Sequence, residues 1–173
     1  GGSFLNPGEI PLAAQARMAQ GVAGSEKTSI LRVESRVPYI VEETVAPLID
    51  ILKPARKTLD IAIGFETQDE VLRNKKLVKG MSKAGFAKAV DTSKRLGARV
   101  SAYIILMPVD MSERHAIEEC VASIRYVFAT GVDEVLLQAR YSHHPDVKAP
   151  KLWSIARVLR ETADLGPVML GQW

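Results

Sequence analysis

The chain has 173 residues, of which 47% are hydrophobic and 25% are charged. This size supports one domain with a substantial core and is too small for two ordinary ones, so we expect a single domain over residues 1–173. The net charge of +3 comes from 23 basic and 20 acidic residues spread along the sequence, which gives only weak support for an anionic ligand.

Cys120 is the only cysteine, which excludes an internal disulfide and any iron–sulfur or zinc site built from several cysteines of this chain. A reducing compartment fits this composition best. No apolar run approaches the roughly 20 residues that span a bilayer, and the first residues, "GGSFLNPGEIP", lack the pattern of a secretory signal. We therefore predict a soluble, cytoplasmic protein with no membrane partner.

The first half of the chain alternates between strand and helix patterns. "ILRVE" (30–34) predicts a strand, and "IVEETVAPLIDIL" (40–52) predicts a helix that Pro47 should break or kink. "LDIAIGF" (59–65) predicts a strand that is buried on both faces.

The second half continues the alternation. "AGFAKAVDTSKRLG" (84–97) predicts a helix that ends at Gly97, and "ARVSAYIILM" (98–107) predicts the next strand. Ser112 is a favourable N-cap for a helix that ends at Gly131. The remaining predicted elements are a strand at 132–139, a helix at 151–166 and a short strand within 167–173.

This order predicts an α/β fold, because helices of this length connect neighbouring parallel strands. A closed barrel of eight β/α units needs about 250 residues. We therefore predict a partial, open parallel β/α barrel of about four to five units.

Polar residues follow the predicted strands at the point where each strand ends. In parallel α/β folds, these carboxyl ends form the ligand-binding edge. Any one of these residues is explained equally well as a helix cap or a solvated loop residue, but their number at one edge favours a site. The polar residues are Glu34, Ser35, Arg36, Glu66, Asp110, Gln138 and Arg140, and Pro108 lies at the same edge.

Four segments in this order resemble the radical S-adenosylmethionine superfamily: "GGSFLNPGEIP", "RVESR", "LDIAIGFET" with "LVKG", and "AYIILMPVDMSERHAIEEC". The closest branch is that of the archaeosine synthase radical S-adenosylmethionine subunit, and the Elongator catalytic subunit is more distant. The resemblance covers about residues 1 to 140. It implies a partial (β/α)6 barrel that cleaves S-adenosylmethionine reductively at a [4Fe-4S] cluster, and a role in tRNA modification.

The resemblance also implies a set of cofactor-binding residues. Gly2 and Ser3 match a glycine-rich segment that meets the methionine amino group. Glu34, Ser35 and Arg36 match a Glu-Ser-Arg motif, Glu66 matches a strand-end glutamate, and Lys79 matches a Lys-Gly motif. An ionised carboxylate at Glu66 would accept hydrogen bonds from ribose hydroxyls or a ligand ammonium group.

The sequence departs from the family in its cysteines. The family holds its cluster with Cys-x3-Cys-x2-Cys, which is absent here, so this chain by itself does not support the [4Fe-4S] cluster. We expect Cys120 to pack in the core instead. Met107, Pro108 and Val109 stand where the branch has Lys-Pro-Pro. The first barrel strand would precede Gly1, so the chain is either the C-terminal part of a longer protein or a short paralogue.

Three hypotheses follow. The chain is a radical S-adenosylmethionine-like core segment that has an S-adenosylmethionine or nucleotide cleft and is inactive alone. Alternatively, it is a non-catalytic binding or interaction module derived from that fold. The third hypothesis is an unrelated β/α-barrel enzyme in which Glu66 and Lys79 transfer a proton. The residues identify no catalytic group for the first two hypotheses.

Other motifs are weak. "GVAGSEKT" (21–28) lacks the glycine that precedes the lysine of a phosphate loop, and "SHHPD" (142–146) has a loop composition rather than a metal-site pattern. We expect Trp153 and Trp173 to pack against the rest of the protein. An open sheet edge, or the end of the chain that carries Trp173, predicts association into a homo-oligomer or contact with a missing N-terminal half. RNA is a further expected partner if the tRNA-modifying branch is the right one.

Overall fold

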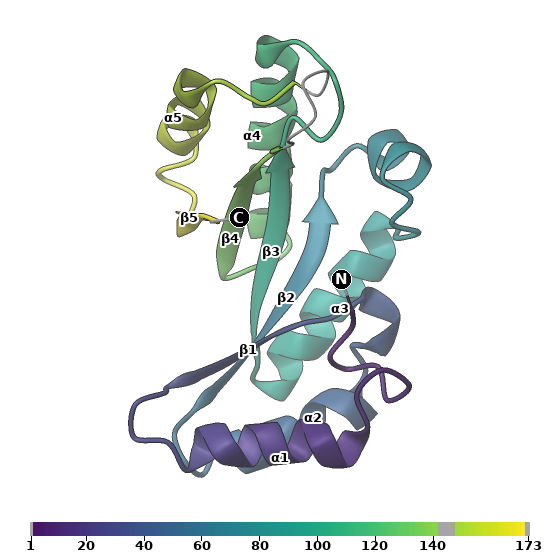
Figure 1. Ribbon diagram of the computed structural model, residues 1–173, viewed down its shortest axis with the longest axis vertical. Coiled ribbons are helices and arrows are strands. Elements are labelled where there is room, and N and C mark those ends of the chain that lie inside the picture. The colour runs from purple at the N-terminus through teal and green to yellow at the C-terminus, as the bar shows by residue number, and fades with distance from the viewer. Residues whose placement is uncertain (1, 142–147, 172–173) are drawn as a thin grey trace. The chain divides into compact units, whose positions relative to one another are not determined.

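A computed structural model describes residues 2–141 and 148–171. Strands and helices alternate along the chain (Figure 1). The elements are α1 Leu12–Ala23, β1 Ile30–Glu34, the 3-10 turn η1 Val37–Tyr39, α2 Glu42–Leu52, β2 Thr58–Glu66, the π-helical turn η2 Leu72–Lys76, α3 Lys83–Leu96, β3 Arg99–Leu106, α4 Glu113–Ala129, β4 Glu134–Ala139, α5 Leu152–Glu161 and β5 Val168–Leu170.

The five strands form one open parallel sheet, in which they follow one another in chain order from β1 to β5. Strand β1 pairs with β2 from Ile30 beside Thr58 to Glu34 beside Ala62. Strand β4 pairs in the same sense with β5. The predicted α/β class, the parallel sheet and the fifth strand are therefore confirmed.

The chain divides into two compact units. One comprises residues 1–64 and 85–101, and the other comprises residues 65–84 and 102–173. We call them the first and second unit. The single domain expected over the whole chain stays a prediction.

In the first unit, α1 and α2 pack against each other, as Figure 1 shows. Helix α3 buries the face predicted from its periodicity, including Phe86, Ala89 and Val90. Gly97 ends this helix with φ of 93°, the left-handed conformation expected there. Residue Asp60 of β2 is completely buried, and its carboxylate accepts hydrogen bonds from Arg32 Nε at 2.7 Å and from Ser101 Oγ at 2.9 Å.

In the second unit, α4 packs against α5. Ser112 caps α4 as predicted, because its side chain accepts a hydrogen bond from the backbone N–H of His115. The first residue of α4, Glu113, accepts hydrogen bonds from the Lys151 N–H and the Ser154 hydroxyl, and so caps α5. Cys120 lies in α4 and is buried, as expected.

Helix α2 continues through Pro47, so the expected break does not occur, and the alternative of a kink stays a prediction. The proline removes one hydrogen bond from the first turns, but Val45, Leu48 and Leu52 are buried on both sides of it and hold the helix. Trp153 is 51% exposed rather than packed, because it lies off the face of α5 that buries Ser154 and Val158. Trp173 lies outside the described residues.

Candidate functional site

In the first unit, the N-terminal segment lies against the end of β1. The Phe4 N–H donates to the Glu34 carbonyl at 2.8 Å. The hydroxyls of Ser3 and Ser35 share a hydrogen bond of 2.7 Å, and the Arg36 N–H donates to Ser3 Oγ at 3.1 Å. The structure therefore brings together the five predicted site residues of this unit: Gly2, Ser3, Glu34, Ser35 and Arg36.

The polar groups of this segment are largely engaged with one another. Ser3 and Ser35 are 1% and 3% exposed, so their hydroxyls fix the N-terminal segment to the strand end. Glu34 and Arg36 are exposed at the same strand end and carry opposite charges. The Glu34 carboxylate and the Arg36 guanidinium therefore face solvent at this strand end, whereas the two serine hydroxyls do not.

Sequence reasoning missed Glu9, which organises the N-terminal loop. Its carboxylate accepts hydrogen bonds from the Ser3 N–H at 2.6 Å and from Asn6 Nδ2 at 2.9 Å. The hydrogen bond from the Asn6 side chain, and to a smaller extent the one from the Ser3 N–H, holds the pKa of Glu9 below its ordinary value. A Cβ added to Gly2 would lie 2.7 Å from Glu9 Oε2, so any larger residue would displace this carboxylate.

In the second unit, the structure brings together the other two predicted site residues. Lys79 Nζ lies 2.6 Å from Glu66 Oε1. The Glu66 side chain is 10% exposed and that of Lys79 is 34% exposed. Glu66 ends β2 with φ of 68°, a left-handed conformation that is uncommon for residues other than glycine. The carboxylate at the end of this buried strand is therefore paired with a lysine from the following loop.

The loop that carries Lys79 is built around a buried arginine. The Arg73 side chain is completely buried, donates to the Thr67 carbonyl at 2.7 Å and to the Met81 carbonyl at 2.9 Å, and lies over the Phe65 ring at 4.7 Å. The Arg73 carbonyl accepts a hydrogen bond from the Lys79 N–H. Burial lowers the pKa of Arg73. Arg73 therefore fixes the backbone from which Lys79 reaches Glu66.

A buried carboxylate from α4 fixes the start of the same loop. Glu119 accepts hydrogen bonds from the Thr67 hydroxyl, from Gln68 Nε2 at 3.0 Å and from the Asp69 N–H at 3.1 Å. The Ser123 hydroxyl donates to the same carboxylate at 3.1 Å. These donors compensate for the burial of Glu119, and they attach the loop after β2 to α4.

The predicted strand-end residues of β3 and β4 also meet. Arg140 Nη1 lies 2.6 Å from Asp110 Oδ1, and the Arg140 N–H donates to the Leu106 carbonyl at 3.2 Å. Asp110 and Arg140, which the sequence placed at the same edge, are therefore joined by an ion pair at the ends of these two strands. The single rim expected to unite the residues of both units stays a prediction.

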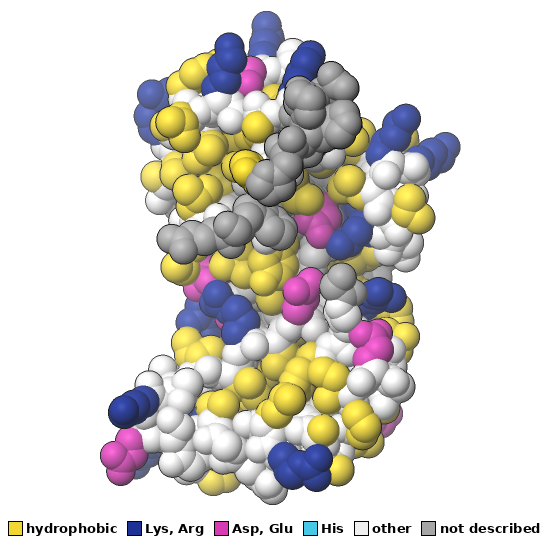
Figure 2. Space-filling model, in the orientation of Figure 1, with side chains coloured by type: hydrophobic (Ala, Val, Ile, Leu, Met, Phe, Trp, Pro, Cys, Tyr) yellow, Lys and Arg dark blue, Asp and Glu magenta, His cyan; other side chains and the backbone are white. Residues whose placement is uncertain are grey.

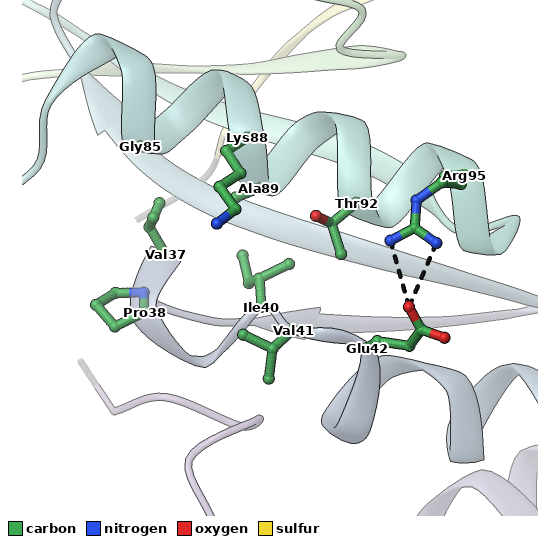
Figure 3. A pocket seen from close by; sticks show the side chains of 10 residues that line it. All are labelled: Val37, Pro38, Ile40, Val41, Glu42, Gly85, Lys88, Ala89, Thr92 and Arg95. Atoms are coloured by element: carbon green, nitrogen blue, oxygen red, sulfur yellow. Dashed lines mark hydrogen bonds and ion pairs between the residues drawn. The ribbon is translucent and has the colours of Figure 1, made fainter.

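The first unit also contains a groove that the sequence did not indicate (Figure 3). It has a volume of about 390 Å³ and an apolar floor that includes Val37, Ile40 and Ala89. Lys88 points from α3 into the groove, and Arg95 pairs with Glu42 at one end, at 3.3 Å (Figure 3).

The described residues do not fit a [4Fe-4S] cluster. Cluster ligands are thiolates, whereas Cys120 is buried in α4, and this burial raises the pKa of its thiol. Among residues 2–141 and 148–171, no group of three or more His, Cys, Asp or Glu side chains is arranged to hold a metal ion. His143, His144 and Asp146 of the "SHHPD" segment lie outside the described residues. Within the described ranges, no helix is both long and apolar enough to cross a bilayer.

Known proteins similar to this chain include two archaeal subunits with a named activity. The chain is 29% identical over 175 residues to archaeosine synthase subunit beta of Methanosarcina acetivorans, an alignment that covers 96% of this chain and 50% of the relative. It is 28% identical over 167 residues to archaeosine synthase subunit beta of Thermococcus kodakarensis, covering 91% and 51%. An uncharacterized protein of Methanocaldococcus jannaschii is 25% identical over 179 residues, covering 98% and 48%.

No protein-family profile matches the chain. The chain spans about half the length of the curated relatives it matches. The names of two relatives share the words "archaeosine synthase" with the branch indicated by the sequence motifs. These names do not mention S-adenosylmethionine, so they do not test the radical chemistry that the resemblance implies.

Proposed function

We propose that this chain is part of a subunit of an archaeosine-forming, tRNA-modifying synthase, in which it acts as a binding and interaction module. The observation that carries the proposal is the similarity to two archaeosine synthase beta subunits over 91% and 96% of the chain. Similarity of this extent includes both compact units, so it is not confined to one common motif.

The word "subunit" in the relatives' names supports a partner polypeptide as part of the same proposal. The interaction-module hypothesis from the sequence fits these findings better than the hypothesis of a radical S-adenosylmethionine-like core segment with an S-adenosylmethionine cleft does. The state of Cys120 agrees, because the only thiol of the chain is buried within a helix. Any cluster chemistry in the assembly would use ligands from outside this chain.

The proposal is tested by disrupting the gene for this chain in its own host and measuring archaeosine in hydrolysed tRNA by mass spectrometry. We expect archaeosine to disappear and to return when the wild-type gene is restored. Unchanged archaeosine in the disrupted strain would refute the proposal, provided that the host tRNA contains archaeosine before disruption.

A second candidate function is the binding of S-adenosylmethionine at the strand ends. It is supported by the motif resemblance and by two local arrangements: the Glu66–Lys79 pair and the contact between Ser3 and the end of β1. A zwitterionic ligand would find a carboxylate and an ammonium group 2.6 Å apart in the second unit. The exposed Glu34 and Arg36 present the same two charges in the first unit.

Isothermal calorimetry with S-adenosylmethionine and S-adenosylhomocysteine tests this candidate. Binding that is lost in Glu66→Gln and in Lys79→Met would support it. Binding unaffected by both substitutions would exclude these two residues from the site. Absence of heat with millimolar ligand and folded wild-type protein would remove the small-molecule function while leaving the interaction module intact.

A further inference from the structure

The acidic side chains at the end of β2 and in the loop before α3 accept hydrogen bonds from donors of the same region. Glu66 pairs with Lys79. The Asp69 carboxylate accepts hydrogen bonds from two N–H groups at the start of the π-helical turn, those of Val71 and Leu72, at 2.7 and 3.0 Å. Glu70 accepts from Arg73 Nη2 at 3.1 Å and from the Lys83 N–H at 3.2 Å. All three carboxylates are therefore engaged locally.

Two lysines of the same loop have the opposite arrangement. Lys75 and Lys76 are exposed side by side in η2, and within the described part of the chain neither forms a hydrogen bond or ion pair through its side chain. Figure 2 shows basic side chains projecting from the region of η2 into solvent. The loop thus presents a positive end whose charge is not neutralised by its own carboxylates.

An apolar side chain lies next to these lysines in an unfavourable environment. Val78 is 79% exposed and has φ of 53°, a conformation that is strained for a β-branched residue. The hydrogen bond from the Lys79 N–H to the Arg73 carbonyl and the left-handed Gly80 on the other side hold the backbone in this form. Neither burial nor backbone preference therefore accounts for a valine at this position.

We infer that Lys75, Lys76 and Val78 form a contact surface for the RNA substrate, which we call the basic tip. This inference rests on the proposed function, since the RNA is the tRNA that the assembly would modify. Each lysine would contact a backbone phosphate, and Val78 would pack on a ribose or base exposed beside those phosphates. Arg73 would act as a positioning residue, because it fixes the turn from which these side chains project.

RNA explains the composition of the basic tip better than an acidic protein does. Two neighbouring lysines would bind the negative charges of RNA or of an acidic protein equally well. Val78, an apolar residue whose backbone is held in place beside them, favours a ligand that has uncharged rings next to its negative charges. Nucleic acid has such rings along the whole chain. The buried Arg73 and Glu119 contacts keep the loop in place before binding, so less ordering is needed when RNA binds.

The first test measures the affinity of the full chain for a tRNA transcript at several salt concentrations. Neutralised phosphates make log K fall linearly with log salt, with a slope of about 0.7 to 0.9 per contact. The double variant Lys75→Gln, Lys76→Gln should therefore reduce the magnitude of the slope by about 1.4 to 1.8. The matched control is Lys27→Gln, Lys53→Gln, which removes the same charge from exposed positions of the first unit.

A reduction in slope that is confined to the first variant supports the basic tip. An equal reduction in both variants would show attraction to net charge only, and no reduction in either would place the phosphate contacts elsewhere. Both results overturn the inference.

The second test uses Val78→Gly, which relieves the backbone strain and removes the side chain. We expect an unchanged or higher midpoint of thermal unfolding, together with a roughly fivefold loss of tRNA affinity, the effect of about 1 kcal/mol. Poly-glutamate is the comparison ligand, and its affinity should not respond to this substitution. If tRNA affinity is retained, or if both ligands are affected equally, the assignment to RNA is wrong.

The archaeosine measurement separates this inference from the proposed function. Loss of archaeosine in the gene-disrupted strain, combined with normal tRNA binding by the basic-tip variants, would refute the basic tip alone. Unchanged archaeosine in that strain would refute the proposed function and, with it, the substrate assigned to the tip.

Discussion

Replacing Arg73 with methionine tests whether the loop that presents Lys79 depends on a buried guanidinium. The substitution removes the donor to the Thr67 carbonyl and one of the two side-chain donors to the Met81 carbonyl, since Asn74 Nδ2 also donates to Met81 at 3.0 Å. An acceptor left unsatisfied in the interior costs about 1–3 kcal/mol. Loss of the cation over the Phe65 ring adds about 0.5–2 kcal/mol.

Part of this cost is recovered, because the variant no longer buries a charge, and the methionine side chain fills most of the space. We therefore expect Arg73→Met to lower the free energy of unfolding by about 3 kcal/mol, a large fraction of the 5–15 kcal/mol typical of a folded domain. Urea unfolding followed by circular dichroism measures this change.

The control is Arg17→Met, which makes the same substitution on the exposed surface of α1 and should change stability by less than about 0.5 kcal/mol. Arg73→Lys keeps the charge, but a single ammonium group cannot reproduce the planar fork that reaches two carbonyls, so it should also be destabilising. A loss below about 1 kcal/mol for Arg73→Met would refute the conclusion that this side chain holds the loop together.

Three further predictions concern other parts of the chain. Asp60→Asn should destabilise the first unit by about 1–3 kcal/mol, because it weakens the buried hydrogen bonds with Arg32 and Ser101; an unchanged urea midpoint would contradict this. Glu9 has a lowered pKa in the folded state, so its contribution to stability is present above its ordinary pKa of 4.5 and is lost as the pH falls through the folded value. Wild type should therefore exceed Glu9→Gln in stability at pH 7, with the difference vanishing in acid, and a constant difference across this range would be inconsistent with the lowered pKa. The Cys120 thiol should react with Ellman's reagent only after unfolding, because it is buried and its pKa is raised; rapid reaction of the native protein would argue against its place in the core.

The sequence predicted elements well where local chemistry determines them. Strand β1 has the predicted bounds, Ile30–Glu34, because β-branched and apolar residues there are followed immediately by polar ones. Helix α3 ends at Gly97 because the left-handed conformation that closes the helix favours glycine. Helix α2 does not break at Pro47, because the local cost of proline is outweighed by burial on both sides of it, which depends on tertiary packing.

The candidate site was predictable only in part, for the same reason. Strand-end position and motif resemblance identified Glu66 and Lys79, and the structure shows them as a pair. The role of Arg73 was not predictable, because an arginine in "LRNKK" has the composition of a solvated turn, and its burial depends on the Thr67 and Met81 carbonyls. No local sequence signal specifies contacts of that kind.

The most direct test of the central claim is the archaeosine content of tRNA from the host, with its own gene disrupted and then restored. The account predicts that archaeosine is absent after disruption, returns with the wild-type gene, and returns incompletely with the Lys75→Gln, Lys76→Gln variant. Normal archaeosine in the disrupted strain would contradict the assignment of this chain to an archaeosine-forming assembly.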